Sequence, residues 1–306
     1  MNSAHLWSDP LYRETAALIL IFLFGLSGIV FFLRKKNTLF KASWESLKSW
    51  IFMTPIILLF FGFTKPWPII LLTIVGIYAA KIFFQMVGMY HRGWFVWVSY
   101  VFIALFGVSI HYQVFAIYDL LPMIFLGLAS IIPLIRNSAK RMVQYIALSL
   151  MAVIFFGWSL LHLGKILDFE KGIYIVIYIY LLSEIAENVS ITVNYLWSKH
   201  KFFTKISNRV SLEGLLASVF FTLVLAWAMR HLLPIRTEPY WIAAGLICSL
   251  VGRFGSLFIS VIRRDLGLKD TGVFIIGRGD MVDRIDKLIF TAPVFYYAYI
   301  YINRTF

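Results

Sequence analysis

The chain has 306 residues, of which 61% are hydrophobic, 18% aromatic and 14% charged, and its mean hydropathy is +0.83. Soluble domains are roughly half apolar and a quarter charged, so this composition excludes a soluble globular protein and predicts an integral membrane protein. The single cysteine, Cys248, excludes an intramolecular disulfide framework. The net charge of +13 does not indicate nucleic-acid binding, because the basic residues are spread over the loops between apolar segments.

Ten apolar segments follow one another along the chain, each near the roughly 20 residues that span a bilayer. They lie at 15–33, 47–63, 67–88, 94–110, 114–135, 142–163, 172–197, 212–229, 239–262 and 286–302. The second segment is short and is interpreted as a tilted or partial span. We therefore predict an all-α polytopic membrane protein with about nine to ten transmembrane helices, built as a single integral membrane domain over 1–306.

The distribution of Lys and Arg predicts the topology of these spans. If the N-terminus is outside, the loops on the cytoplasmic side hold 19 basic residues, whereas the other loops and tails hold 7. This excess favours N- and C-termini outside the cytoplasm. The cytoplasmic loops are then 34–48, 89–93, 136–141, 198–211 and 263–287. Short loops and the lack of a targeting segment favour a bacterial inner (cytoplasmic) membrane.

The most informative segment is the charged stretch Ser260–Asp286 between the last two spans. Its 27 residues include four arginines, one lysine and five aspartates. Arginines and the lysine can hold phosphate oxygens. Asp283 and Asp286 are three residues apart, so at a helix start they share a face and can hold a hard cation such as Mg²⁺. The alternative interpretation is a basic anchor for anionic lipid headgroups, which needs neither five aspartates nor regularly spaced glycines.

This stretch resembles the signature of the CDP-diacylglycerol synthases (CTP:phosphatidate cytidylyltransferases). That signature reads Ser, two residues, Lys/Arg-Arg, four residues, Lys-Asp, one residue, a small residue, three residues, Pro-Gly-His-Gly-Gly, two residues, Asp-Arg, one residue, Asp. Short stretches at 212–214 and 288–295 also resemble the family. The residues that match the signature in register are Ser260, Arg263, Arg264, Lys269, Asp270, Gly272, Gly277, Gly279, Asp283, Arg284 and Asp286.

The chain is therefore identified as a divergent member of this family, with N-terminal helices over 1–170 and a family-like catalytic half over 171–306. The resemblance implies that it joins CTP to phosphatidate or a related anionic lipid in the membrane, giving CDP-diacylglycerol and pyrophosphate, with Mg²⁺ and a further monovalent cation as cofactors. A homodimer is a further expectation.

The resemblance and the residue chemistry together give a set of candidate site residues. The expected catalytic residues are Asp283, Asp286, Lys269 and Asp270. The expected metal ligands are Asp283, Asp286 and Asp280. The expected phosphate-binding residues are Ser260, Arg263, Arg264, Arg284, Arg278, Lys205, Arg209 and Ser211.

The chain also departs from the family pattern around the expected metal site. An Asn-Asp pair of the family falls on Ser190 and Ile191, and a metal-binding Asp falls on Ser256. Fewer carboxylates weaken a Mg²⁺ site. The loop lysine of the family is Val210 here, with Arg209 beside it.

Other charged residues in the spans offer replacements for the lost carboxylates. Glu184 and Glu187 in the seventh segment can reach the site, or else they are satisfied by Lys81 or the backbone. Arg253 either faces the same cavity as a phosphate ligand or extends toward the membrane surface.

Three functions remain open on this basis. The first is an active cytidylyltransferase with a rearranged metal site. The second is a family member that has lost catalysis and binds a phospholipid or nucleotide as a subunit or regulator. The third is a lipid transporter or scramblase, which lacks support because the sequence shows no paired broken helices or inverted repeat.

Overall fold

The computed structural model describes residues 6–35, 38–207, 210–268 and 280–305. Its described residues form helices and no strand, apart from an isolated bridge between Lys201 and Ser211. In chain order the helices are α1 (Pro10–Leu33), α2 (Thr38–Phe61), α3 (Trp67–Met86), α4 (Gly93–His111), α5 (Phe115–Ile135), α6 (Met142–Ala152), η2 (Val153–Ser159), α7 (His162–Ile166), α8 (Gly172–Trp197), α9 (Leu212–Ala228), α10 (Glu238–Leu246), η4 (Ile247–Val251), α11 (Gly252–Asp265) and α12 (Met281–Thr305). Short 3₁₀ turns lie at η1 (Leu6–Ser8) and η3 (Arg230–Leu232).

The predicted all-α polytopic fold is confirmed. A helix lies at each of the ten apolar segments. Seven of the helical stretches in the described part of the chain are long and apolar enough to cross a membrane. Two segments are interrupted by π-helical turns, η2 in the sixth and η4 in the ninth. Such turns widen the backbone spiral locally and occur often at functional sites.

Two predicted boundaries differ from the structure. The second apolar segment is short, as predicted, since its apolar part covers only Leu47–Phe61. It is the later part of a longer helix, because α2 begins at Thr38. The last helix begins at Met281 rather than at 286. Its first turns are charged, so hydropathy alone missed them.

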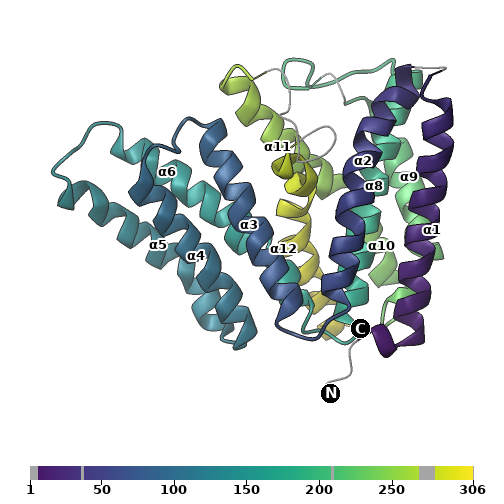
Figure 1. The fold of residues 1–306 in the computed structure, drawn as a ribbon, viewed down its shortest axis with the longest axis horizontal. Helices are drawn as coiled ribbons and strands as arrows, with labels where there is room; N and C mark the ends of the chain where they lie inside the picture. The colour runs from purple at the N-terminus through teal and green to yellow at the C-terminus, as the bar shows by residue number, and fades with distance from the viewer. Residues whose placement is uncertain (1–5, 36–37, 208–209, 269–279, 306) are drawn as a thin grey trace.

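The connections between helices divide between the two ends of the bundle (Figure 1). The first residues of α1 and the last residues of α12 lie at one end, and the last residues of α1, α3, α5, α8 and α11 lie at the other. We call this second end the loop face. The described parts of the five basic loops that the charge distribution had grouped together lie at this end.

Helix α12 is the centre of the arrangement (Figure 1). It packs against α3, α7, α8, α10 and α11. Its buried apolar residues, among them Ile285, Leu288, Ile289 and Phe295, belong to the main hydrophobic core. The charged residues in its first turns are therefore held between several helices near the loop face.

Candidate functional site

Two aspartates close the start of α12 by hydrogen bonding to each other's backbone. The Asp283 N–H donates to Asp280 Oδ1 at 3.0 Å, and the Asp280 N–H donates to Asp283 Oδ2 at 3.2 Å. This reciprocal arrangement is a capping box, in which two otherwise unpaired amides at a helix start are satisfied. Negative charge is also favourable there, because the helix dipole is positive at its N-terminus.

The guanidinium of Arg263, at the end of α11, holds both of these carboxylates. Its Nη2 lies 3.1 and 3.0 Å from the two oxygens of Asp280, and its Nη1 contacts Asp283 Oδ1. The three side chains are only 13–21% exposed. Such an arginine fork fits carboxylate geometry well. Two expected metal ligands are thus bound to a residue that was expected to hold phosphate.

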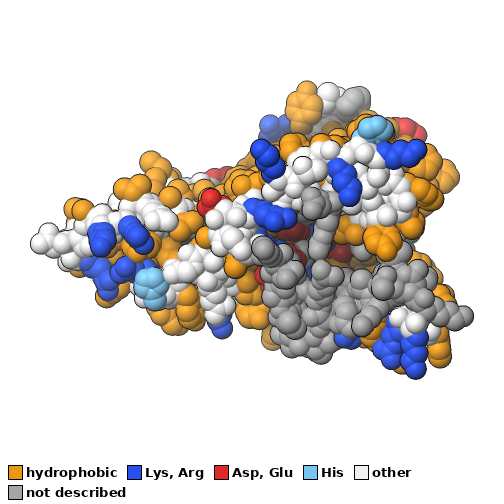
Figure 2. Space-filling model, turned by 90° about the horizontal axis from the view of Figure 1, so that it is seen from above, with side chains coloured by type: hydrophobic (Ala, Val, Ile, Leu, Met, Phe, Trp, Pro, Cys, Tyr) orange, Lys and Arg blue, Asp and Glu red, His pale blue; other side chains and the backbone are white. Residues whose placement is uncertain are grey.

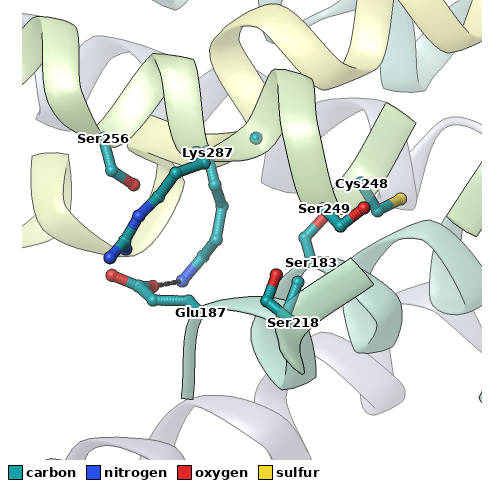
Figure 3. Close-up of a pocket in the computed structure, with 10 residues that line it drawn as sticks. Ser183, Glu187, Ser218, Cys248, Ser249, Ser256 and Lys287 are labelled. Atoms are coloured by element: carbon teal, nitrogen blue, oxygen red, sulfur yellow. Dashed lines mark hydrogen bonds and ion pairs between the residues drawn. The ribbon is translucent and has the colours of Figure 1, made fainter. Parts of the chain in front are cut away.

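A second ionic cluster lies one turn further along α12. The ammonium of Lys287 lies 2.5 Å from Glu187 Oε2 and also contacts Glu184 Oε1, both on α8. Lys287 is only 2% exposed, and Figure 3 shows its side chain meeting that of Glu187. The buried Asp286 accepts a hydrogen bond from the Lys287 N–H at 2.6 Å. The glutamates of the seventh segment therefore do reach the signature helix, and their ionic partner is Lys287 rather than Lys81.

Glycines on α11 bring this helix against the start of α12. A Cβ built on Gly255 would lie 2.3 Å from the carbonyl oxygen of Asp286, and one on Gly252 would lie 3.2 Å from Thr291 Oγ1. No side chain fits at Gly255 without a shift of backbone. This close approach holds the Asp286–Lys287 pair directly against α11.

A small polar cavity lies between α8, α9, η4, α11 and α12 (Figure 3). Its volume is about 10 Å³, which is close to the space needed for one water molecule. The π-helical turn η4 supplies two of its residues. The polar and charged residues that line it are Ser183, Glu187, Ser218, Cys248, Ser249, Arg253, Ser256 and Lys287.

The cavity answers two questions that the sequence left open. Arg253 does line it, beside Glu187 and Lys287. Ser256, where the family pattern has an aspartate, lines the same cavity, so the lost carboxylate position faces a cluster that already contains an acid and a base. The positive charges of Arg253 and Arg284 also act on Glu187.

Other predicted residues make contacts with the protein itself. The hydroxyl of Ser260 donates to Ser256 O at 2.9 Å. Ser211 is fully buried and caps α9, since its Oγ accepts from Gly214 N at 3.1 Å. Arg264 donates to Ile206 O at 3.1 Å and so ties the end of α11 to the loop before α9.

Of the six remaining predicted residues, the structure describes two, Arg284 and Lys205. Arg284 lies over the ring of Trp50, with its guanidinium carbon 5.5 Å from the ring centre. Lys205 is exposed in the loop before α9. Lys269, Asp270, Arg278 and Arg209 lie outside the described residues.

Figure 2 shows the loop face from above. Lys and Arg side chains are distributed across it, and acidic side chains are visible between them near its middle. Anionic headgroups and nucleotides are attracted to such a face.

Lys287 was not among the residues predicted from the sequence. It was counted with the cytoplasmic loop 263–287, although the last apolar segment was placed at 286–302. A signal was present, since a lysine at the start of an apolar segment needs an acidic partner when it is buried, and Glu184 and Glu187 were already noted.

The described side chains do not fit a protein-bound Mg²⁺. Among residues 6–35, 38–207, 210–268 and 280–305, no group of three or more His, Cys, Asp and Glu side chains is arranged to hold a metal ion. Mg²⁺ needs several oxygen ligands in near-octahedral geometry. The carboxylates near α12 instead bind Arg263 and Lys287.

The fold and this site define a polytopic helical membrane protein with a buried, charge-paired cluster beneath a basic face. A profile of the cytidylyltransferase family matches residues 44–302. The chain belongs to this family, and the expected membership is confirmed.

Named relatives point in the same direction. The chain is 29% identical over 127 residues to a phosphatidate cytidylyltransferase of Staphylococcus aureus, covering 41% of this chain and 48% of that protein. It is 34% identical over 109 residues to one of Synechocystis, covering 33% of this chain and 35% of that protein. It is 33% identical over 160 residues to the uncharacterized protein YnbB of Escherichia coli, covering 48% and 52%. The chain thus spans about half the length, or less, of the curated relatives it matches.

Proposed function

We propose that this protein transfers a cytidylyl group from CTP to phosphatidate or a related phosphorylated lipid, in phospholipid biosynthesis. The observation that carries the proposal is the match to the cytidylyltransferase family over residues 44–302. The named relatives in Staphylococcus aureus and Synechocystis are phosphatidate cytidylyltransferases. The arginines around α11 and α12 supply the positive charge that such substrates require.

In the proposed reaction an oxygen of the lipid phosphate attacks the α-phosphorus of CTP. A new phosphorus–oxygen bond forms, the bond to the bridging oxygen breaks, and pyrophosphate leaves. Phosphoryl chemistry of this kind is mostly a matter of positioning and charge stabilisation. The buried cavity of about 10 Å³ is too small for a nucleotide. We therefore expect CTP to bind above it, on the loop face, where Arg263 and Arg264 end α11.

A second function is favoured by a specific observation. Arg263 holds Asp280 and Asp283, and Lys287 holds Glu184 and Glu187. Side chains that are bound to each other are less available for substrate or metal. A family member with this arrangement would bind a phospholipid or nucleotide as a subunit or regulator without turning it over.

An activity assay separates the two functions. The purified protein in lipid nanodiscs is incubated with labelled CTP, phosphatidate and Mg²⁺, and CDP-lipid and pyrophosphate are measured. We expect both products, their loss in Asp286→Asn, and their retention in Asp265→Asn, which changes an exposed aspartate at the end of α11. Size-exclusion profiles check that both variants fold. No product with several phosphorylated lipids, together with retained CTP or lipid binding, would reject the enzyme and favour the binding function.

We further propose a bacterial inner membrane location, with the loop face cytoplasmic and both termini outside, since CTP is a cytoplasmic nucleotide. Cysteine labelling tests this topology, because the natural Cys248 is buried. A cysteine at Lys140 should be labelled only in opened cells, and one at Arg304 in intact spheroplasts. Mg²⁺, a monovalent cation and a homodimer stay predictions, which omission of each cation from the assay and mass measurement in nanodiscs test.

A further inference from the structure

Acidic side chains surround a single buried lysine near the start of α12. Lys287 is almost fully buried and contacts two glutamates that are one helical turn apart on α8. Asp286 is buried beside it, and the charges of Glu187 and Asp286 act on each other. Two carboxylates therefore contact one buried ammonium group, and the third, that of Asp286, accepts a hydrogen bond from the backbone N–H of Lys287. A buried lysine is rare unless it is paired.

Without the ammonium of Lys287, the carboxylates around it would resemble a cation site. Glu184 and Glu187 offer up to four carboxylate oxygens, which are the ligands that hard divalent cations prefer. Lys287 sits among them as a single positive charge fixed to the chain. Its position is set by the backbone, because Gly255 allows α11 to press on the carbonyl of Asp286.

We propose that the ammonium of Lys287 is a built-in counter-ion that takes the place of a protein-bound metal ion between α8 and α12. The two α8 glutamates are then structural partners of a lysine and do not hold Mg²⁺. This concerns the same site as the proposed function, and only its consequence for catalysis rests on that function. If the protein is an enzyme, the only metal it uses comes with the nucleotide or binds elsewhere on the loop face.

The buried cluster of Lys287, Glu184 and Glu187 is stable only as a complete set. Desolvating one lysine and two glutamates is costly, and the cost is recovered only when all partners are present with good geometry. Removing the lysine leaves buried carboxylates without a cation. A cation bound from solution would stabilise these carboxylates. A divalent ion matches the two negative charges of Glu184 and Glu187.

Mn²⁺ alone, without CTP or lipid, serves as the probe. Binding to the full-length protein in detergent is measured by electron paramagnetic resonance for the wild type, Glu187→Gln, Lys287→Ala and the double variant. We expect Lys287→Ala to gain about one Mn²⁺ per chain over the wild type, since it frees a set of carboxylates, and the double variant to lose that gain. Glu187→Gln in the wild-type background should leave Mn²⁺ binding unchanged.

Two results would overturn the proposal. One is a folded Lys287→Ala protein with no additional Mn²⁺. The other is reduced Mn²⁺ binding in Glu187→Gln while Lys287 is present, which would mean that the glutamates hold a metal beside the lysine. If Lys287→Ala does not fold, the wild type and Glu187→Gln still decide the question. These measurements involve no turnover, so their outcome is independent of whether CDP-lipid forms.

Discussion

Substitution of Gly255 by alanine should destabilise the protein through the contact of α11 with α12. The added Cβ would lie 2.3 Å from the carbonyl oxygen of Asp286, whereas ordinary contacts begin at 3.4 Å. The helices would have to separate by about 1 Å to restore normal contact, and overpacking of this kind costs about 1–3 kcal/mol. A carbonyl cannot rotate away like a side chain, so we take the upper end, about 3 kcal/mol. Alanine recovers about 1 kcal/mol of helix propensity, which leaves a net loss of about 2 kcal/mol.

The assay is thermal or chemical unfolding of the purified protein in one detergent, read by the same probe for a graded set of variants. Gly252→Ala is the intermediate case, because its Cβ would lie 3.2 Å from the side-chain oxygen of Thr291, which can move. Gly25→Ala is the control, since nothing lies within 4 Å of its Cβ in α1. The expected order of stability is Gly25→Ala, then Gly252→Ala, then Gly255→Ala. Equal stability of the first and last would refute the close contact.

Three further predictions test the caps and a buried hydrogen bond. Asp280→Ala removes both the helix cap, which contributes about 1 kcal/mol, and the acidic partner of Arg263, so it should lower the unfolding midpoint more than Asp280→Asn, which keeps the cap and loses only the charge; equal midpoints for the two variants would mean that the cap contributes nothing. Ser211→Ala should lower stability by about 1 kcal/mol, because it removes the cap of α9. Ser211→Thr should keep most of the wild-type stability in the same assay, because Thr also caps helices. Tyr12→Phe removes the donor to Leu58 O, at 2.5 Å, and should lower stability by about 1 kcal/mol; an unchanged midpoint would mean that this bond contributes nothing.

Hydropathy was enough to find the helices, for a physical reason. A bilayer requires about 20 apolar residues per span, so the ten segments coincide with helices along the whole chain. The start of α12 was misplaced because its first turns are charged. Their stability comes from the Asp280 cap and from Arg263, which hydropathy does not register.

The sequence predicted where the site lies but not which of its charged residues pair with each other. Asp280 and Asp283 are three residues apart, and this spacing suits both a shared metal and a capping box. Sequence alone could not separate these uses, because the choice depends on where Arg263 lies. Likewise, the pairing of Lys287 with Glu187 joins residues that are 100 positions apart. It requires the packing of α8 on α12, which no local pattern contains.

The contact between Arg263 and Asp280 also closes the chain between α11 and α12. The residues that flank the stretch 264–279, Arg263 and Asp280, are held together by an ion pair. For a stretch whose ends are fixed, doubling its length costs only about 0.6 kcal/mol in closure entropy. Changes of length or sequence between these ends therefore leave the helices nearly unaffected. The ion pairs of Arg263 thus anchor the start of α12 directly to the end of α11, without a contribution from the residues between them.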